Sequence, residues 1–222
     1  MKFFQSVIQS CDSPEFLGEV LRKYHYRDED AETLRETALR IKESIEQNAC
    51  WNCRMQITDM NEENSFMEVA MTLGEKIDQL QEQYLQTGLL TEGYMVETLA
   101  SEILLRGYSA FNQWVSEQTD YAVSRYYFLG SSREYPLSML PDLLDHLKLP
   151  VTCNQAYCMI PKKSVAFVAA LSRNKNTHCQ GICVGCSSPD CPNRMTEDNG
   201  VRYRLADMTD RPLSYGYARI LG

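Results

Sequence analysis

Four cysteines lie within thirteen residues in the last quarter of the sequence and follow the spacing C-x3-C-x2-C-x4-C. Glycine, serine and proline are frequent between them. A tight metal-binding loop needs this composition, because the backbone must bend sharply for four thiolates to converge on one centre. We therefore expect a metal or iron–sulfur site on these four residues, which are Cys179, Cys183, Cys186 and Cys191.

The rest of the sequence indicates a reducing compartment. No apolar run approaches the roughly 20 residues that a membrane helix needs, and the N-terminal residues turn polar too early for a secretory signal peptide. We expect a cytoplasmic protein that is not inserted in a membrane. In that compartment, clustered members of a set of nine cysteines bind metal or do redox work more often than they form disulfides.

The spacing of the four cysteines favours an iron–sulfur cluster, most simply a four-iron cluster, over zinc. Structural zinc sites commonly place two short cysteine pairs on either side of a longer loop. Here the ligands are compressed, as in iron–sulfur runs, although zinc stays open as the alternative. The first three cysteines also match the triplet of radical S-adenosylmethionine enzymes, but too few residues follow Cys186 to build the barrel of those enzymes.

Other cysteines, and the histidine beside the cluster, each fit either a structural or a functional role. Cys50 and Cys53 form a C-x2-C pair that we expect to close a helix, whereas thioredoxin-like pairs open one, so their role stays open. Cys153 and Cys158 lie on a strand-like run and are expected to be buried structural thiols. His178 is either a ligand or, more commonly for such a position, a loop residue.

Hydrophobic periodicity predicts an α+β protein. Helices are expected over 31–48, 66–87 and 91–118. A strand-like run from Tyr121 breaks at Gly130. A short helix and two strand-like runs joined at Pro161 follow, over 136–148, 151–160 and 163–171.

The predicted order of these elements divides the chain into three segments. N-terminal helices come first, then a mixed or antiparallel sheet flanked by helices, and finally a cysteine-rich metal loop. The corresponding boundaries are 1–64, 65–175 and 176–222. The net charge of −8, without a cluster of Lys and Arg, argues against a nucleic acid partner.

Several stretches between residues 66 and 187 resemble the activation domain of vitamin B12-dependent methionine synthase, especially its small stand-alone versions. They read MTLGEKIDQL, TEGYMVETLASEIL, SRYYFLGSSREYPL and CNQAYCMIPKKSVAFVAAL. The segment AYCMIPKKSV is similar to the family pattern T-E-S-x-x-M-x-P-x-x-S-V-S-G. Met159, Pro161, Ser164 and Val165 match it, while Gln155 stands at the acidic position and Phe167 at the glycine.

A second part of the resemblance concerns the cofactor. Arg125 and Gly130 resemble the arginine and glycine of the R-x-x-x-G-Y loop, which holds S-adenosylmethionine in the family. The spacing is one residue longer here, and Tyr135 stands in for the tyrosine. The resemblance implies that Arg125, Gly130, Tyr135, Gln155 and Ser164 bind the cofactor. An arginine suits its carboxylate, although a surface salt bridge would use the same residue type.

The resemblance also implies a function. Members of this family restore a spent cobalamin by one-electron reduction and methylation from S-adenosylmethionine. The family has a tyrosine-containing strand at the position where this chain has NTHCQGIC, the start of the cysteine loop. We therefore expect a cluster that passes an electron to cobalamin presented by a corrinoid methyltransferase, with a possible electron-donor protein. The alternative is a non-enzymatic protein-binding module stapled by zinc.

Overall fold

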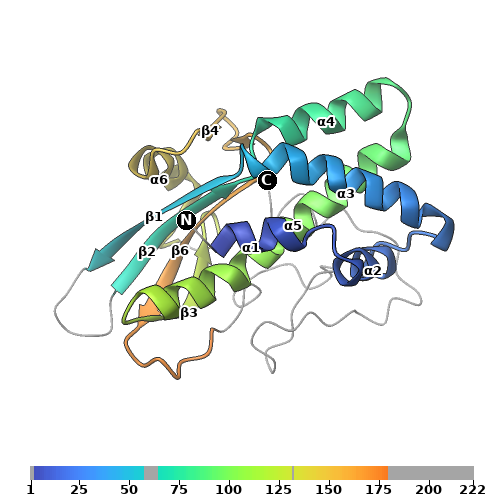
Figure 1. Cartoon of the computed structure of the whole chain (residues 1–222). Helices are drawn as coiled ribbons and strands as arrows, with labels where there is room; N and C mark the ends of the chain where they lie inside the picture. Colours follow the sequence, from blue (N-terminus) through green and yellow to red (C-terminus); the bar gives the residue numbers. More distant parts are fainter. Residues whose placement is uncertain (1–2, 58–64, 132, 180–222) are drawn as a thin grey trace.

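The computed structural model describes residues 3–57, 65–131 and 133–179. Within these ranges the chain forms an antiparallel sheet with long helices on one face and a short helix with a hairpin on the other (Figure 1). The expected α+β class is confirmed. None of the described helices is long and apolar enough to cross a membrane.

Three helices and a short 3-10 turn precede the first strand. The N-cap of the second helix is Ser13, whose Oγ accepts a hydrogen bond from the backbone N–H of Phe16 at 3.2 Å. The third helix buries the apolar stripe that its periodicity predicts, ending at Ile45, and the expected helix over 31–48 is confirmed. These elements are α1 (Phe3–Ser10), α2 (Pro14–Lys23), η1 (Asp28–Asp30) and α3 (Ala31–Glu46).

Helices α4 (Glu75–Gln86) and α5 (Leu90–Gln118) form an antiparallel pair. The expected helix over 91–118 is confirmed as α5, which is buried on most of its circumference because α1, α3, α4 and the sheet pack around it. A Cβ at Gly107 would lie 3.2 Å from the Phe4 ring and 3.4 Å from Met71 Sδ. This glycine therefore marks where α5 meets α1 and the sheet.

The sheet has the strand order β1-β2-β6-β3, and every neighbouring pair is antiparallel. Its two faces alternate along each strand. The pair Val69 and Phe167 packs into the main core beneath the helices, and the next pair, Ala70 and Ala166, faces the opposite side. The four strands are β1 (Cys50–Ile57), β2 (Ser65–Thr72), β3 (Ala122–Phe128) and β6 (Ser164–Ser172).

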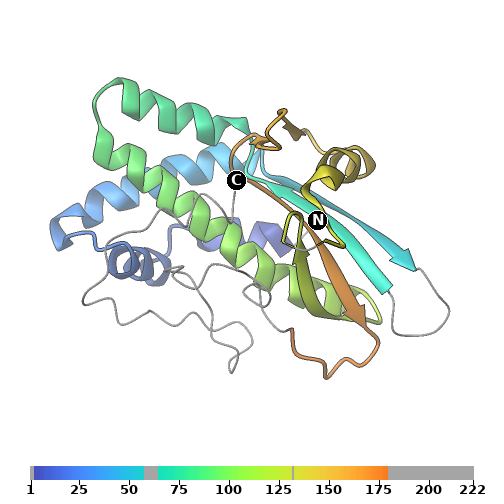
Figure 2. The same ribbon diagram turned by 180° about the vertical axis from the view of Figure 1, so that it is seen from behind.

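The opposite face is covered by α6 (Leu140–Leu147) and the hairpin of β4 (Thr152–Cys153) and β5 (Met159–Ile160), as both views show (Figures 1 and 2). Four leucines of α6 pack with small and apolar residues of the sheet in a second, smaller cluster. The expected helix over 136–148 is divided: η2 (Leu137–Met139) comes first, and α6 begins only with Pro141 in its first turn.

The expected helix over 66–87 is wrong in its first half. Residues 65–72 form strand β2, and only 75–86 are helical, with Gly74 at φ +86° between them. The run FMEVAM is apolar except for Glu68 and is covered on both faces, because β2 is a central strand of the sheet. A short run of that kind has no periodicity that separates a strand from a buried helix.

One further expectation is corrected by strand β1. Cys50 and Cys53 lie on this strand and do not close a helix, since α3 ends at Glu46. The N-terminal helices α1 to α3 precede an antiparallel sheet that α4, α5 and α6 flank, as expected, with α4 and α5 following β1 and β2 in the chain. The proposed boundary after residue 64 falls between two paired strands, and one core contains both Phe4 and Phe167.

Candidate cofactor-binding site

Strand β3 carries Arg125 on the face of the sheet that α6 covers. Its neighbour Tyr126 is 3 % exposed in the main core, so Arg125 and Tyr127 on either side of it face the other way. The register of β3 against β6 shifts between Val123 and Arg125. Such a bulge re-aims the side chains that follow it and is common beside functional sites.

The side chain of Arg125 lies against an aromatic ring, and one of its N–H donors makes no hydrogen bond with the described residues. Its guanidinium carbon is 5.1 Å from the centroid of the Tyr127 ring, a cation–π contact. Its Nε is buried and has no hydrogen-bond partner among the described residues. A buried donor without an acceptor is unfavourable, so a ligand that supplies an acceptor oxygen there would gain binding free energy.

Tyr135 extends this arrangement from the loop after β3. Its ring stacks on that of Tyr127 with centroids 4.8 Å apart and planes at 28°. The backbone N–H of Gly130 donates to the Tyr135 carbonyl at 2.7 Å, which closes the loop. Gly130 has φ +85°, a conformation that favours glycine. Burial, followed by the neighbouring Tyr127 and Glu134, raises the pKa of Tyr135, so its hydroxyl stays protonated at neutral pH.

Three of the five predicted cofactor-binding residues therefore lie together: Arg125, Gly130 and Tyr135. Tyr127 joins them and was missed, because it matches nothing in the pattern on which the resemblance depends. A signal was nevertheless present in the sequence. Residues two apart on a strand share a face, so the predicted strand already placed Tyr127 next to Arg125.

The other two predicted residues have different surroundings. Ser164 is fully buried; its Oγ donates to the Pro161 carbonyl at 2.7 Å and lies 2.8 Å from Thr72 Oγ1, so its hydrogen bonds are made inside the fold. Gln155 is exposed at the tip of the β4–β5 hairpin. That hairpin packs through Tyr157 on the same small cluster that contains Tyr127 and Tyr135.

Of the four predicted metal ligands only Cys179 is described, and it is half-buried against the main core on the helical side of the sheet. Cys183, Cys186 and Cys191 lie outside the described residues. Among the residues that the structure describes, no three His, Cys, Asp or Glu side chains are grouped closely enough to hold a metal ion. The expected centre on these four cysteines thus remains a prediction.

The segment leading to Cys179 is anchored on the end of α5. The ammonium of Lys175 donates to the carbonyl of Ser116 at 2.5 Å and also to that of Thr119. Ser116 lies in the last turn of α5 and Thr119 is its C-cap residue, so the ammonium lies at the helix end where the helix dipole favours a cation. Thr177 Oγ1 bonds Ser172 Oγ at 3.1 Å. Cys179 is therefore held at a defined place beside the core, with the exposed His178 next to it.

The remaining cysteines do not form a redox pair in this structure. Cys50 and Cys53 are three residues apart on a regular strand, so their side chains point to opposite faces. Burial raises the pKa of both thiols, that of Cys53 to about 11, which keeps them protonated and unreactive. Cys153 is half-buried, but Cys158 is exposed on the hairpin, so the expectation that both are buried is wrong for Cys158.

The sequence matches no protein-family model and is not significantly similar to any curated protein. The interpretation of the site consequently depends on its residues and their geometry.

Proposed function

We propose that this protein reactivates a cobalamin-dependent methyltransferase of the methionine synthase kind. The observation that carries the proposal is the buried, unpartnered Nε of Arg125 beside the stacked rings of Tyr127 and Tyr135. In the reaction, one electron reduces cob(II)alamin on the partner, and a methyl group then passes from the S-adenosylmethionine sulfur to cobalt, which leaves S-adenosylhomocysteine.

The chemistry of the Arg125 cluster suits S-adenosylmethionine. A carboxylate accepts hydrogen bonds from two N–H groups of a guanidinium, and the free Nε of Arg125 supplies one of them. The rings of Tyr127 and Tyr135 offer an aromatic surface of the kind on which a purine stacks. No residue of this chain needs to act as nucleophile or general base, because the cofactors carry the reaction.

The electron is assigned to an iron–sulfur cluster held by Cys179, Cys183, Cys186 and Cys191, with four irons favoured. Such clusters work as one-electron carriers whose potential depends on the hydrogen bonds around the sulfurs. An electron-donor protein would reduce the oxidised cluster again. These partners are expected to meet in the cytoplasm. The corrinoid protein binds the cobalamin, so this chain supplies the methyl donor and the electron.

Binding of S-adenosylmethionine is tested by isothermal titration on the native protein and on Arg125→Ala. We expect heat from the native protein and a loss of affinity of at least about tenfold in the variant, because a charge-assisted pair is removed. Arg133→Ala is the matched control, since Arg133 is an exposed arginine in the same loop, and its affinity should be unchanged. A native protein that gives no heat would remove the cofactor from the proposal.

The electron-transfer part has a separate test. An anaerobically purified protein should be brown, with broad absorption near about 400 nm that dithionite bleaches. Cys186→Ala should be colourless. The brown protein, mixed with dithionite, S-adenosylmethionine and methionine synthase in its cob(II)alamin form, should convert that form to methylcobalamin. Conversion at the same rate with Cys186→Ala would contradict a role for the cluster.

A second function is favoured by the position of Cys179. This residue packs on the helical side of the sheet, whereas Arg125 faces the α6 side. A zinc ion on the four cysteines would then staple the C-terminal segment of a protein-binding module. A colourless sample that contains one equivalent of zinc, and that loses stability when the zinc is chelated, would support this alternative.

A further inference from the structure

We propose that Tyr127 is a positioning residue of the site, which fixes both the guanidinium of Arg125 and the ring of Tyr135 for ligand binding. The identity of the ligand depends on the proposed function, but the positioning role can be tested without any ligand. No sequence pattern assigned Tyr127 a role, and the inference comes from its contacts.

The ring of Tyr127 contacts both Arg125 and Tyr135, two of the side chains predicted to bind the ligand. Tyr127 has the guanidinium of Arg125 at 5.1 Å from its centroid and the ring of Tyr135 at 4.8 Å. Arg125 belongs to the strand, whereas Tyr135 belongs to the loop that follows it. Tyr127 thus links the position of the strand to that of the loop.

The ring of Tyr127 is itself well anchored. Its residue pairs with Val168 of β6, and its side chain packs in the small cluster between the sheet and α6. Tyr135 is additionally tied to Gly130 by the 2.7 Å backbone hydrogen bond. The Nε of Arg125 has no hydrogen bond that could orient the guanidinium. Its orientation in the free protein is therefore set by the aromatic contact, which favours a guanidinium stacked on the ring.

The ring of Tyr127, and not its hydroxyl, makes the contacts that position Arg125 and Tyr135. Tyr127→Phe keeps the ring, the cation–π contact and the stack, so it should bind S-adenosylmethionine within about twofold of the native protein. Tyr127→Leu keeps much of the apolar volume but removes both aromatic contacts. We expect it to lose about tenfold in affinity, because the guanidinium is no longer held in one orientation before the ligand binds.

A readout in the free protein separates this proposal from the proposed function. The Nε–Hε resonance of Arg125, assigned by its disappearance in Arg125→Lys, should be displaced by the ring current of Tyr127 in the ¹⁵N-labelled protein. The displacement should persist in Tyr127→Phe and vanish in Tyr127→Leu. If Tyr127→Leu does not fold, as judged by its thermal transition, Tyr127→Met replaces it with a flexible apolar side chain of similar length.

Each result then decides one of the two proposals. An unchanged resonance in Tyr127→Leu, or an unchanged affinity for S-adenosylmethionine in that variant, overturns the positioning role. A native protein that binds no S-adenosylmethionine overturns the cofactor assignment, and the resonance of Arg125 still decides on Tyr127. Loss of affinity in Tyr127→Phe as large as in Tyr127→Leu would assign the role to the hydroxyl and also overturn the proposal.

Discussion

Lys163, the residue before strand β6, forms an ion pair with Glu97 on helix α5, and its ammonium lies 3.4 Å from Ser101 Oγ. The lysine side chain is only 7 % exposed, whereas that of Glu97 is 39 % exposed. Gln81 of α4 donates to the same carboxylate at 3.0 Å. The start of β6 is thereby tied to both helices of the α4–α5 pair.

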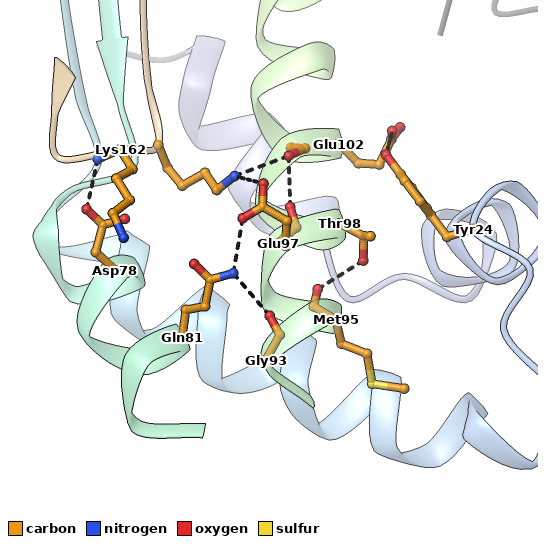
Figure 3. A network of polar contacts seen from close by, with 11 residues as sticks. Tyr24, Asp78, Gln81, Gly93, Met95, Glu97, Thr98, Glu102 and Lys162 are labelled. Atoms are coloured by element: carbon orange, nitrogen blue, oxygen red, sulfur yellow. Dashed lines mark hydrogen bonds and ion pairs between the residues drawn. The ribbon is translucent and has the colours of Figure 1, made fainter. Parts of the chain in front are cut away.

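The neighbouring backbone is tied in the same direction. The N–H of Lys162 donates to the Asp78 carboxylate at 2.8 Å (Figure 3), and the carbonyl of Lys163 accepts from the N–H of Leu73 at 2.9 Å. The segment PKKSV, which is central to the family resemblance, therefore has a structural role in joining the sheet to the helices. Lys163 and Ser164 are buried in the fold, whereas Lys162 is exposed and contributes its backbone N–H.

Replacing Glu97 should destabilise the protein more than replacing an exposed carboxylate. Glu97→Gln leaves the buried ammonium of Lys163 without its counter-charge, which should cost about 1–3 kcal/mol of unfolding free energy. Glu32→Gln removes an exposed pair with Arg35 and should change stability by less than about 0.5 kcal/mol. Urea unfolding of both variants tests this. Equal losses of unfolding free energy would show that the buried pair contributes no more to stability than the exposed pair.

Two glycines with positive φ provide a matched test of backbone packing. Gly74 has φ +86°, and a Cβ there would lie 2.7 Å from Asn48 Cβ and 2.9 Å from its carbonyl oxygen. Gly88 has φ +80° with nothing within 4 Å. Gly88→Ala should cost about 1 kcal/mol from the left-handed conformation alone.

Gly74→Ala should cost about 2–4 kcal/mol, because the overlap with the end of α3 adds to the same conformational term. Thermal unfolding of the two variants measures the difference directly. Equal destabilisation would mean that the turn between β2 and α4 shifts away from α3 at no cost.

Periodicity predicted the long helices because each buries one stripe or most of its surface over several turns. It failed at β2, where the run around Val69 is covered on both faces and shows no clear hydrophobic period. The position of Gly74 was informative in retrospect, since a glycine between two apolar runs marks a break as readily as a close contact. Strand β2 is buried on both faces by elements that are distant in the sequence, so its local sequence could not distinguish a strand from a helix.

The candidate site was only partly predictable for a similar reason. The resemblance identified Arg125 and Tyr135, whose positions follow from one strand and one short loop. It could not find Tyr127, whose role depends on a stacking contact across that loop. Ser164 matched the pattern, yet its contact with Thr72 arises from the pairing of β6 with β2, between residues 92 positions apart, and no local pattern reveals such a contact.

Two buried thiols should make the protein less stable in alkali. Burial raises the pKa of Cys11 to about 12 and that of Cys53 to about 11, from 9.0. The folded protein therefore holds these protons more tightly than the unfolded chain does. The stabilisation is complete below pH 9 and is lost between pH 9 and about 12, because the unfolded chain releases its protons first.

The expected slope is up to about 1.4 kcal/mol per pH unit for each thiol. Urea unfolding at pH 8, 9.5 and 11 should show a shallower loss in Cys53→Ala than in the native protein. Comparing the two proteins cancels the titration of the tyrosines and lysines that they share. Parallel losses in both would show that Cys53 does not titrate differently in the folded and unfolded states.

The anchor of the segment that leads to Cys179 can be removed with one substitution. Lys175→Met loses two charge-assisted hydrogen bonds at the C-terminal end of α5, to the carbonyls of Ser116 and of the C-cap residue Thr119. Such contacts contribute about 0.5–1 kcal/mol, so the variant should unfold slightly more easily. Lys76→Met, at an exposed position on α4, is the control and should behave like the native protein.

The sharper effect of Lys175→Met should appear at Cys179 itself. This cysteine is half-buried because the segment before it is held against the core, so freeing the segment should make its thiol react several times faster with iodoacetamide in metal-free protein. Mass spectrometry of the labelled peptides measures the rate, with the exposed Cys158 as an internal reference whose rate should not change. A constant ratio of the two rates would mean that Lys175 does not determine where the first predicted metal ligand lies.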